Sequence, residues 1–279
     1  TLSGRESLMA DGQRAAKTMS RPVRVLLGAL AILWWVGAAE GVALADEERE
    51  AELREQMVRE QLMISQDGRI PIVNLRVLEA MRAVPRHRFV PPEMQAFAYQ
   101  DRPLPIGEGQ TISQPYIVAL MTELADLRPG EKVLEIGTGC GYQAAVLAQL
   151  TDRVYTIELI DALARRAKHT LLELGLTSVH VQVGDGYAGW PEEAPFNAII
   201  VTAAAPHLPE LLVDQLAMRG RLVVPIGQDE QELIVFRKKP KGLVREVVIP
   251  VRFVPMMGRI QGALKSVEKG SYELRAPDD

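Results

Sequence analysis

Three glycines follow a short apolar run in the middle of this sequence, and their spacing is the first feature that suggests chemistry. Val133–Ile136 is rich in apolar residues, as in a buried parallel strand, and Gly137, Gly139 and Gly141 follow it. A helix is predicted to begin at Gln143. A strand that turns through glycine into a helix lets a ligand approach the unpaired N–H groups of the helix. The stretch predicts a nucleotide-like cofactor, although a tight turn without a ligand has the same composition.

The glycine spacing distinguishes between two kinds of cofactor. A dinucleotide-binding fingerprint places its third glycine three residues after the second, where this chain has Tyr142. The pattern found is G-x-G-x-G, with the acidic residue Glu135 inside the strand. It resembles the first motif of class I S-adenosylmethionine (SAM) methyltransferases.

Two carboxylates follow later predicted strands. Glu158 ends the strand predicted over 153–158, where it can accept hydrogen bonds from both ribose hydroxyls of an adenosine. An exposed strand-end residue is the alternative. Asp185 stands between Gly184 and Gly186, after the strand predicted over 179–183. It is placed either to meet an adenine amino group or to form a turn.

The remaining reactive side chains give weaker indications. Cys140 lies in the glycine turn with no histidine near it in sequence, which favours a small packing residue over a nucleophile. His207 follows Pro206 and is interpreted as a surface or helix-start residue, with a substrate contact as the alternative. One cysteine and four scattered histidines cannot build a structural zinc cluster, so no metal is predicted.

Strands and helices alternate around these residues. The pattern predicts an α/β, doubly wound, mostly parallel sheet in which ligands bind at the carboxyl ends of the strands. Two strand-like runs between Glu232 and Pro255 have no helix between them and predict an antiparallel edge pair. The predicted strands are 133–136, 153–158, 179–183, 196–201 and 221–226, and the predicted helices are 143–150, 161–174 and 209–218.

The segment before the sheet is predicted to be helical and irregular. Helices are expected over 46–63 and 73–84, followed by an irregular cover over 86–101. The stretch 104–115 is rich in Gly, Pro, Thr and Ser and predicts a loop, either a plain connector or a cover over a ligand. Ser113 lies where the N-cap of a helix over 114–125 belongs.

Composition and the N-terminal stretch bear on partners and location. The 279 residues are 47% hydrophobic with a net charge of −4, which argues against a nucleic-acid binder with a basic face. Arg21 and Arg24 precede the apolar run 25–36, and Ala43-Leu44-Ala45 follows, which predicts a secretory signal peptide and a periplasmic or exported protein without stable membrane association after cleavage. An N-terminal anchor is the alternative. The predicted division is a 1–45 extension, a 46–110 cover, a 111–262 core and a 263–279 tail.

Several blocks together resemble one family of SAM-dependent enzymes. The resemblance to protein-L-isoaspartate O-methyltransferases of the bacterial type covers roughly 48–262. It rests on Thr111-Ile112-Ser113-Gln114-Pro115-Tyr116, the glycine stretch, Gly184-Asp185-Gly186 and Ala198–Ala204, with further matches at 81–86 and 251–255. Cys140 departs from the serine of many members. The N-terminal leader departs from the usual cytosolic enzymes, so a cytoplasmic location remains an alternative.

The resemblance implies a function and a set of site residues. SAM would methylate the free α-carboxylate of isoaspartyl residues in damaged proteins and peptides, and the ester would close to a succinimide whose hydrolysis returns some aspartate. Ser113 is implied as the active-site residue. The cofactor positions are expected to be Gly137, Gly139, Gly141, Glu158, Asp185 and Gly186. The rival hypotheses are a methyltransferase acting on a small molecule or RNA, and a non-catalytic SAM-binding module. The oligomeric state is not predicted.

Overall fold

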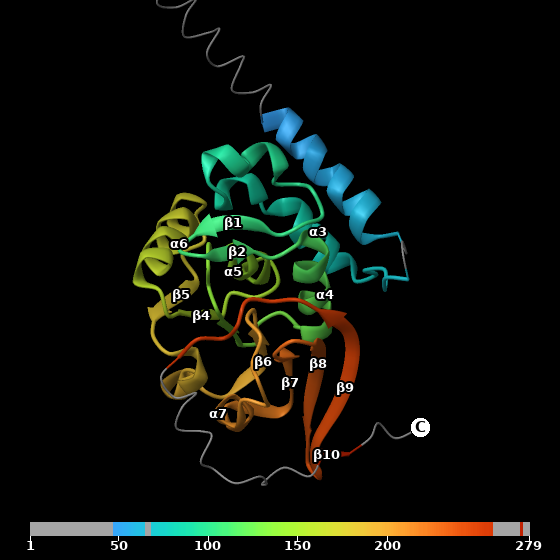
Figure 1. The fold of residues 1–279 in the computed structure, drawn as a ribbon, viewed down its shortest axis with the longest axis vertical. Helices are drawn as coiled ribbons and strands as arrows, with labels where there is room; N and C mark the ends of the chain where they lie inside the picture. The colour runs from blue at the N-terminus through green and yellow to red at the C-terminus, as the bar shows by residue number, and fades with distance from the viewer. Residues whose placement is uncertain (1–46, 65–67, 259–273, 276–279) are drawn as a thin grey trace, which may run out of the picture. The chain divides into compact units, whose positions relative to one another are not determined.

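A computed structural model describes residues 47–64, 68–258 and 274–275 (Figure 1). The predicted signal peptide, the cleavage site after Ala45 and almost all of the predicted tail lie outside the described residues. The described residues from Ala51 onward belong to one compact unit, which includes most of the predicted cover and core. Among the described residues, no helix is long and apolar enough to cross a bilayer.

An eight-stranded sheet forms the centre of this unit, in the order β10-β9-β8-β7-β6-β3-β4-β5. The five strands from β7 to β5 are parallel, and β8 runs antiparallel to both β7 and β9. The chain crosses from one side of β3 to the other between β5 and β6, so the switch point lies beside β3. The bounds are β3 Val133–Ile136, β4 Val154–Glu158, β5 Val179–Val183, β6 Phe196–Val201, β7 Leu216–Gly227, β8 Gln231–Lys239, β9 Gly242–Val251 and β10 Leu274–Arg275.

Helices cover both faces of the sheet, because its parallel strands are apolar on both faces. Successive residues of β3 serve opposite faces: Val133 belongs to one core cluster and Leu134 to the other. The helices α4 (Pro115–Ala125), α5 (Tyr142–Ala148) and α6 (Asp161–Glu173) contribute to the first cluster, and α7 (Glu210–Asp214) contributes to the second. The predicted doubly wound architecture and the antiparallel pair, β8 with β9, are therefore present.

The strand β7 corrects one prediction. A helix was expected over 209–218 with its end at Gly220, but α7 stops at Asp214 and β7 begins at Leu216. The register with β6 shifts at this point, and Arg219 has a φ of 69°. A Cβ on Gly220 would lie 2.8 Å from the carbonyl oxygen of Ala217, so this glycine allows a close backbone approach inside an irregular strand and does not end a helix.

The N-terminal cover packs its apolar side chains on the first face. Residues 47–57 are α-helical and continue into the π-helical turn Val58–Leu62, followed by α3 (Leu75–Ala83). Met57, Val58 and Leu62 are fully buried in the same core cluster as the side chains of α4 and α5. Two 3-10 helices, η2 (Arg86–Phe89) and η3 (Pro92–Phe97), then complete the cover before the chain reaches β1.

The segment predicted as a loop over 104–115 contains a small antiparallel hairpin. Its strands are β1 (Leu104–Gly107) and β2 (Gln110–Ile112). The turn holds Gly107, Glu108 and Gly109 at positive φ, and the high turn-residue content hid the two short strands from the sequence pattern. Arg166 of α6 donates a hydrogen bond of 2.7 Å to the carbonyl oxygen of Ile106 in β1, which ties the hairpin to α6.

Candidate active site

A cleft opens at the carboxyl ends of β3, β4 and β6, where ligands bind in sheets of this type. It has about 830 Å³ of free space, including the part open to solvent. Residues of β2, the glycine turn, the end of β4 and segment 254–257 line it. A second groove of about 1370 Å³, measured in the same way, adjoins it. Thr111, Ser113, Thr202 and Val254 line both spaces.

The glycine turn forms one wall of the cleft and needs glycine for both conformation and space. Gly137, Gly139 and Gly141 have φ values of 95°, 55° and 92°, in the region that side chains disfavour. A Cβ on Gly137 would lie 2.5 Å from the hydroxyl oxygen of Thr202, which donates to the carbonyl oxygen of Gly137 at 2.7 Å. Gly137 and Gly139 line the cleft.

Gly141 has a different role from the other two. It does not line the cleft but serves as the N-cap of α5. A Cβ there would lie 3.3 Å from the Cβ of Ala167 and 3.4 Å from Leu171 of α6. Because Gly141 has no side chain, the start of α5 can pack closely against α6.

Glu158 connects the end of β4 with the glycine turn and lines the cleft. One carboxylate oxygen accepts the N–H of Gly139 at 2.7 Å, and the other accepts the N–H of Ile160 at 2.9 Å. A carboxylate offers about four lone-pair sites, so each oxygen keeps acceptor capacity after these two bonds. The side chain therefore shapes the turn and can still accept hydroxyl donors.

The Gly184-Asp185-Gly186 turn contributes a cleft-lining glycine and a turn-forming aspartate. Asp185 is the N-cap of the 3-10 helix η4 (Gly186–Ala188), and its side chain accepts the N–H of Tyr187 at 3.0 Å. Asp185 does not line the cleft, whereas Gly186 does. A Cβ on Gly186 would lie 2.3 Å from Ile136, so a side chain there would press into the end of β3.

Two buried acceptors, Glu135 and Gln143, also line the cleft; the sequence pattern included Glu135 in the glycine motif but did not predict a site role for either. Glu135 is fully buried; one of its oxygens accepts the Thr156 hydroxyl at 2.6 Å, and the other has no hydrogen-bond partner. Burial raises the pKa of Glu135 to about 8, against the opposing hydrogen bond from Thr156. Gln143 donates to Thr122 at 2.8 Å, and its carbonyl oxygen also has no partner. An acidic residue inside an apolar strand is the sequence signal for Glu135.

Ser113 follows β2 and precedes α4, at the junction of the cleft and the groove. The prediction that it caps α4 was wrong: the N-cap is Gln114, because Pro115 occupies the first turn, and Gln114 makes no side-chain capping bond. Ser113 lies one residue outside the helix. Its hydroxyl has no hydrogen-bond partner within the described part of the chain, whereas its carbonyl oxygen accepts Arg86 Nη2 at 2.7 Å.

Cys140 and His207 show no arrangement for nucleophilic or acid–base chemistry. Cys140 is half-buried and lines the cleft, and burial raises the pKa of its thiol to about 11, so it stays protonated at neutral pH. His207 is exposed, lines neither the cleft nor the groove, and contacts the carbonyl oxygen of Leu208 at 3.3 Å. Within residues 47–64, 68–258 and 274–275, no group of three His, Cys, Asp or Glu side chains could hold a metal ion.

The lining of the cleft fits SAM. The glycine cradle leaves room at the backbone, and Glu158 retains acceptor capacity for ribose hydroxyls. The unpartnered oxygens of Glu135 and Gln143 can accept N–H donors of the positively charged methionine part. The expected contacts of Glu158 concern the ribose of SAM, and those of Glu135 and Gln143 concern its methionine part.

Comparison with known proteins gives consistent matches. The protein-L-isoaspartate(D-aspartate) O-methyltransferase (PCMT) family matches residues 57–261. A protein-L-isoaspartate O-methyltransferase of Gloeobacter violaceus is 59% identical over 182 residues, covering 64% of this chain and 89% of its own length. One from Opitutus terrae is 52% identical over 235 residues, covering 84% and 97%. A Plasmodium falciparum protein of this description, solved with S-adenosyl-L-homocysteine, superposes with a TM-score of 0.62 at 27% identity, covering 75% and 98%.

These matches confirm the predicted fold class, the enzyme class, its isoaspartyl substrate and SAM as the methyl donor. The family and the relatives are described as methyltransferases, so the matches favour an enzyme over a non-catalytic SAM-binding module. The matched residues run from the helical cover through the hairpin, the glycine turn and segment 254–257. This chain belongs to the protein-L-isoaspartate(D-aspartate) O-methyltransferase family.

Proposed function

We propose that Ser113 orients the free α-carboxylate of an isoaspartyl residue for methyl transfer in this enzyme. The observation that carries the proposal is the position of Ser113 on both the cofactor cleft and the adjoining groove. A hydroxyl without a protein partner can donate to a carboxylate that reaches the cleft from the groove. The resulting ester would close to a succinimide, and its hydrolysis would return some aspartate.

The residues expected to bind the cofactor have different roles. Gly137, Gly139 and Gly186 keep the backbone open along the cleft, and Glu158 accepts ribose hydroxyls. We also assign Asp185 to the adenine end, on the basis of its position beside Gly186, and Gly141 to the packing that sets the turn. When bound, SAM supplies a methyl group activated by its sulfonium.

The chemistry needs alignment more than proton transfer. A free α-carboxyl has a pKa of about 3.3–3.7, so the acceptor is already ionised at neutral pH and no base is required. The described cleft accordingly offers a hydroxyl and buried acceptors and no histidine. Holding reactants in line can contribute ~7–11 kcal/mol, and the β1–β2 hairpin, whose second strand lines the cleft, would limit the access of water.

The groove is the proposed seat of the damaged protein segment. Its walls come from the Ser113 loop and from residues 250–254, and Arg252 is the one ionisable side chain among its lining residues. An isoaspartyl site in an extended segment could lie along these walls with its carboxylate at Ser113.

A methyl-transfer assay on two peptides of equal composition tests the function. One peptide carries an isoaspartyl residue and its twin carries an aspartyl residue at the same position, with labelled SAM as donor. We expect label on the isoaspartyl peptide and at most background label on its twin. Equal labelling of the two peptides, or none, would contradict the proposal.

We further propose that residues 1–45 direct export and are removed after Ala45. The support is the order of positive charge, apolar run and Ala43-Leu44-Ala45 in the sequence. N-terminal sequencing of the protein purified from its own cells should begin at Asp46. A start at or before Met19, the methionine that precedes Arg21 and Arg24, with the protein in the cytosolic fraction, would instead favour the cytoplasmic location usual for the family.

A further inference from the structure

Ser113 lies next to the start of α4, a helix whose N-cap residue makes no side-chain hydrogen bond to the first turn. The first residue of α4 is Pro115, which has no N–H, and the N-cap Gln114 makes no side-chain capping bond. The N–H of Tyr116 is nevertheless bound: it donates to Asp101 Oδ1 at 3.1 Å. The cap of α4 is thus supplied by a residue outside the helix, and the carboxylate is also favoured by the positive end of the helix dipole.

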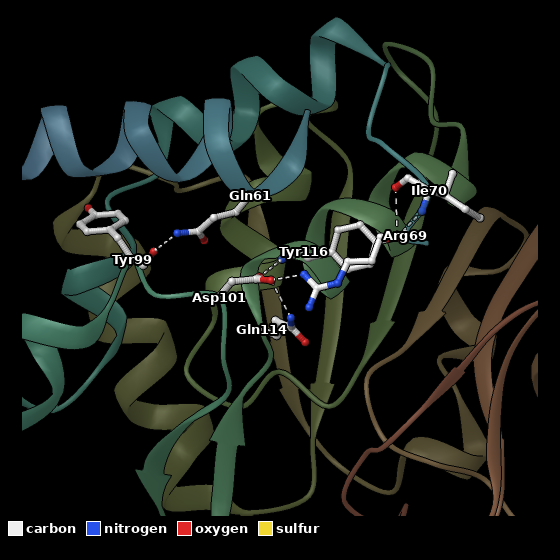
Figure 2. Close-up of polar contacts among 7 residues, drawn as sticks. All are labelled: Gln61, Arg69, Ile70, Tyr99, Asp101, Gln114 and Tyr116. Atoms are coloured by element: carbon white, nitrogen blue, oxygen red, sulfur yellow. Dashed lines mark hydrogen bonds and ion pairs between the residues drawn. The ribbon is translucent and has the colours of Figure 1, made fainter. Parts of the chain in front are cut away.

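Asp101 gathers three donors around the start of α4 (Figure 2). Besides the N–H of Tyr116, its other oxygen accepts Gln114 Nε2 at 2.7 Å and pairs with the guanidinium of Arg69. Arg69 also lies over the ring of Tyr116, 5.1 Å from its centroid. The Asp101 side chain is only 15% exposed, so these charge-assisted bonds are partly shielded from water.

The same network ties α4 to the N-terminal cover. The hydroxyl of Tyr116 donates to the carbonyl oxygen of Ile70 at 3.0 Å and accepts the N–H of Ile70 at 3.1 Å (Figure 2). Arg69 and Ile70 are neighbours in the chain, so the cover reaches the helix start through two adjacent residues. This fixes Gln114 and Tyr116, which stand one and three residues after Ser113.

The other side of Ser113 is held by a buried cation. Arg86 is fully buried, donates to the carbonyl oxygens of Ser113 at 2.7 Å and Ala98 at 2.8 Å, and lies 4.8 Å from the ring centroid of Tyr142. Neither Arg86 nor Asp101 lines the cleft or the groove. Arg86 holds the backbone of Ser113, and Asp101 holds the backbone of Tyr116 and the side chain of Gln114.

We infer that Asp101 is a positioning residue for methyl transfer, which holds the Ser113 hydroxyl at the junction of cleft and groove by capping α4 and binding Gln114. The inference rests on the proposed role of Ser113. Loss of the carboxylate frees the start of α4 and lets the serine shift, and a displacement of about 1 Å at a reacting group can cost on the order of 100-fold in rate.

Glu123 provides a matched control on the same helix. Its carboxylate accepts the N–H groups of Val73 and Asn74, both at 3.0 Å, and so also ties α4 to the cover, but from the last turn of the helix. Glu123→Ala therefore also removes a carboxylate link between α4 and the cover, but one that lies away from Ser113. We expect Asp101→Ala to lower kcat on the isoaspartyl peptide ~10- to 100-fold with SAM affinity kept, and Glu123→Ala to leave kcat within about twofold.

A double-mutant cycle with Ser113→Ala shows whether Asp101 acts through the serine. If it does, adding Asp101→Ala to Ser113→Ala lowers kcat by less than about threefold further. Losses that multiply in the double variant, or a full kcat in Asp101→Ala, would overturn the inference. An active Ser113→Ala would instead contradict the role proposed for the serine itself.

Two further measurements guard against a folding defect. SAM binding by calorimetry reports the fraction of folded sites in each variant. Asp101→Asn keeps one oxygen for the Tyr116 N–H but turns an amide toward Arg69, so we expect a kcat between those of Asp101→Ala and the native enzyme. A kcat for Asp101→Asn at or below that of Asp101→Ala, with full SAM binding, would show that the cap to Tyr116 is not what positions the serine.

Discussion

The hydroxyl of Ser113 differs from most polar side chains near it because the described protein offers it no partner. Glu158, Asp185 and Thr202 each bind backbone groups, whereas Ser113 is bound only through its carbonyl oxygen. The backbone of Ser113 is fixed by Arg86, and its hydroxyl remains available to donate to a ligand. As the N-cap of α4, Ser113 would have accepted a backbone N–H with its Oγ; because it lies one residue outside the helix, its side chain makes no such contact.

Ser113→Ala tests this difference directly. We expect kcat on the isoaspartyl peptide to fall by ~10- to 1000-fold, because the lost bond is charge-assisted and aligns the acceptor, while the dissociation constant of SAM changes little. Steady-state kinetics and calorimetry measure the two quantities. Ser178→Ala, at a half-buried serine just before β5, is the control and should leave both unchanged. Weakened SAM binding without a loss of kcat would move Ser113 from the acceptor to the cofactor.

Glu158→Gln should weaken SAM binding, the quantity that Ser113→Ala leaves unchanged. The substitution turns an amide N–H₂ toward one of two backbone N–H donors and removes the charge, which weakens the hold on the glycine turn and the proposed contact with the ribose. We expect SAM affinity to fall ~10- to 100-fold by calorimetry. Glu173→Gln, at an exposed glutamate of α6, should keep the native dissociation constant. An unchanged affinity in Glu158→Gln would remove this residue from the cofactor site.

At the scale of the element, the glycine turn combines two separate constraints. Gly137 has a φ of 95° and no room for a Cβ, whereas Gly130, in the turn before β3, has a φ of 78° and open space around it. Gly130→Ala should therefore cost only the left-handed conformation, ~1–2 kcal/mol in the free energy of unfolding.

Gly137→Ala should cost more than Gly130→Ala, because it adds a contact with Thr202 to the conformational strain. It should also weaken SAM binding, since the wall of the cleft must move. Urea unfolding and calorimetry on the two variants separate the effects. Equal destabilisation, with SAM affinity kept in both, would mean that the turn relaxes without consequence for the cleft.

The elements show what local sequence pattern can and cannot predict. β3, β5 and β6 were predicted to the residue, because a buried parallel strand is an apolar run between turn residues. The hairpin was missed because its two strands are short and are interrupted by Pro105 and the Gly107-Glu108-Gly109 turn. The start of β7 was predicted too late because this strand begins irregularly, directly after a short helix.

The candidate site also contains features that local sequence predicts and features that it does not. The glycine turn and Glu158 are local features of strand ends, so sequence spacing could point to them; Gly137, Gly139 and Glu158 line the cleft, and their contacts with SAM stay predictions. The cap from Asp101 and the burial of Arg86 depend on segments 12 to 27 residues away from their partners, and no spacing rule connects those positions. The unpartnered oxygen of Glu135 is likewise a property of packing.

For the whole molecule, Glu135 couples the cofactor cleft to the stability of the fold. Its pKa is raised from 4.5 to about 8, chiefly by burial. Between these values the unfolded chain releases the proton while the folded chain retains it. The stabilising contribution is therefore fully present below pH 4.5, falls as the pH rises, and is lost once the pH passes about 8.

Glu135→Gln should abolish this dependence, because the amide occupies nearly the same volume and has no proton to lose. Each pKa unit corresponds to about 1.4 kcal/mol, so the variant should gain a few kcal/mol on the native enzyme between about pH 5 and pH 8. Urea unfolding of both proteins across this range measures the difference, and an exposed glutamate changed in the same way, Glu192→Gln, corrects for the general effect of removing a carboxylate. A difference between native and Glu135→Gln proteins that stays constant with pH would contradict the raised pKa and mean that Glu135 is already ionised in the fold over this range.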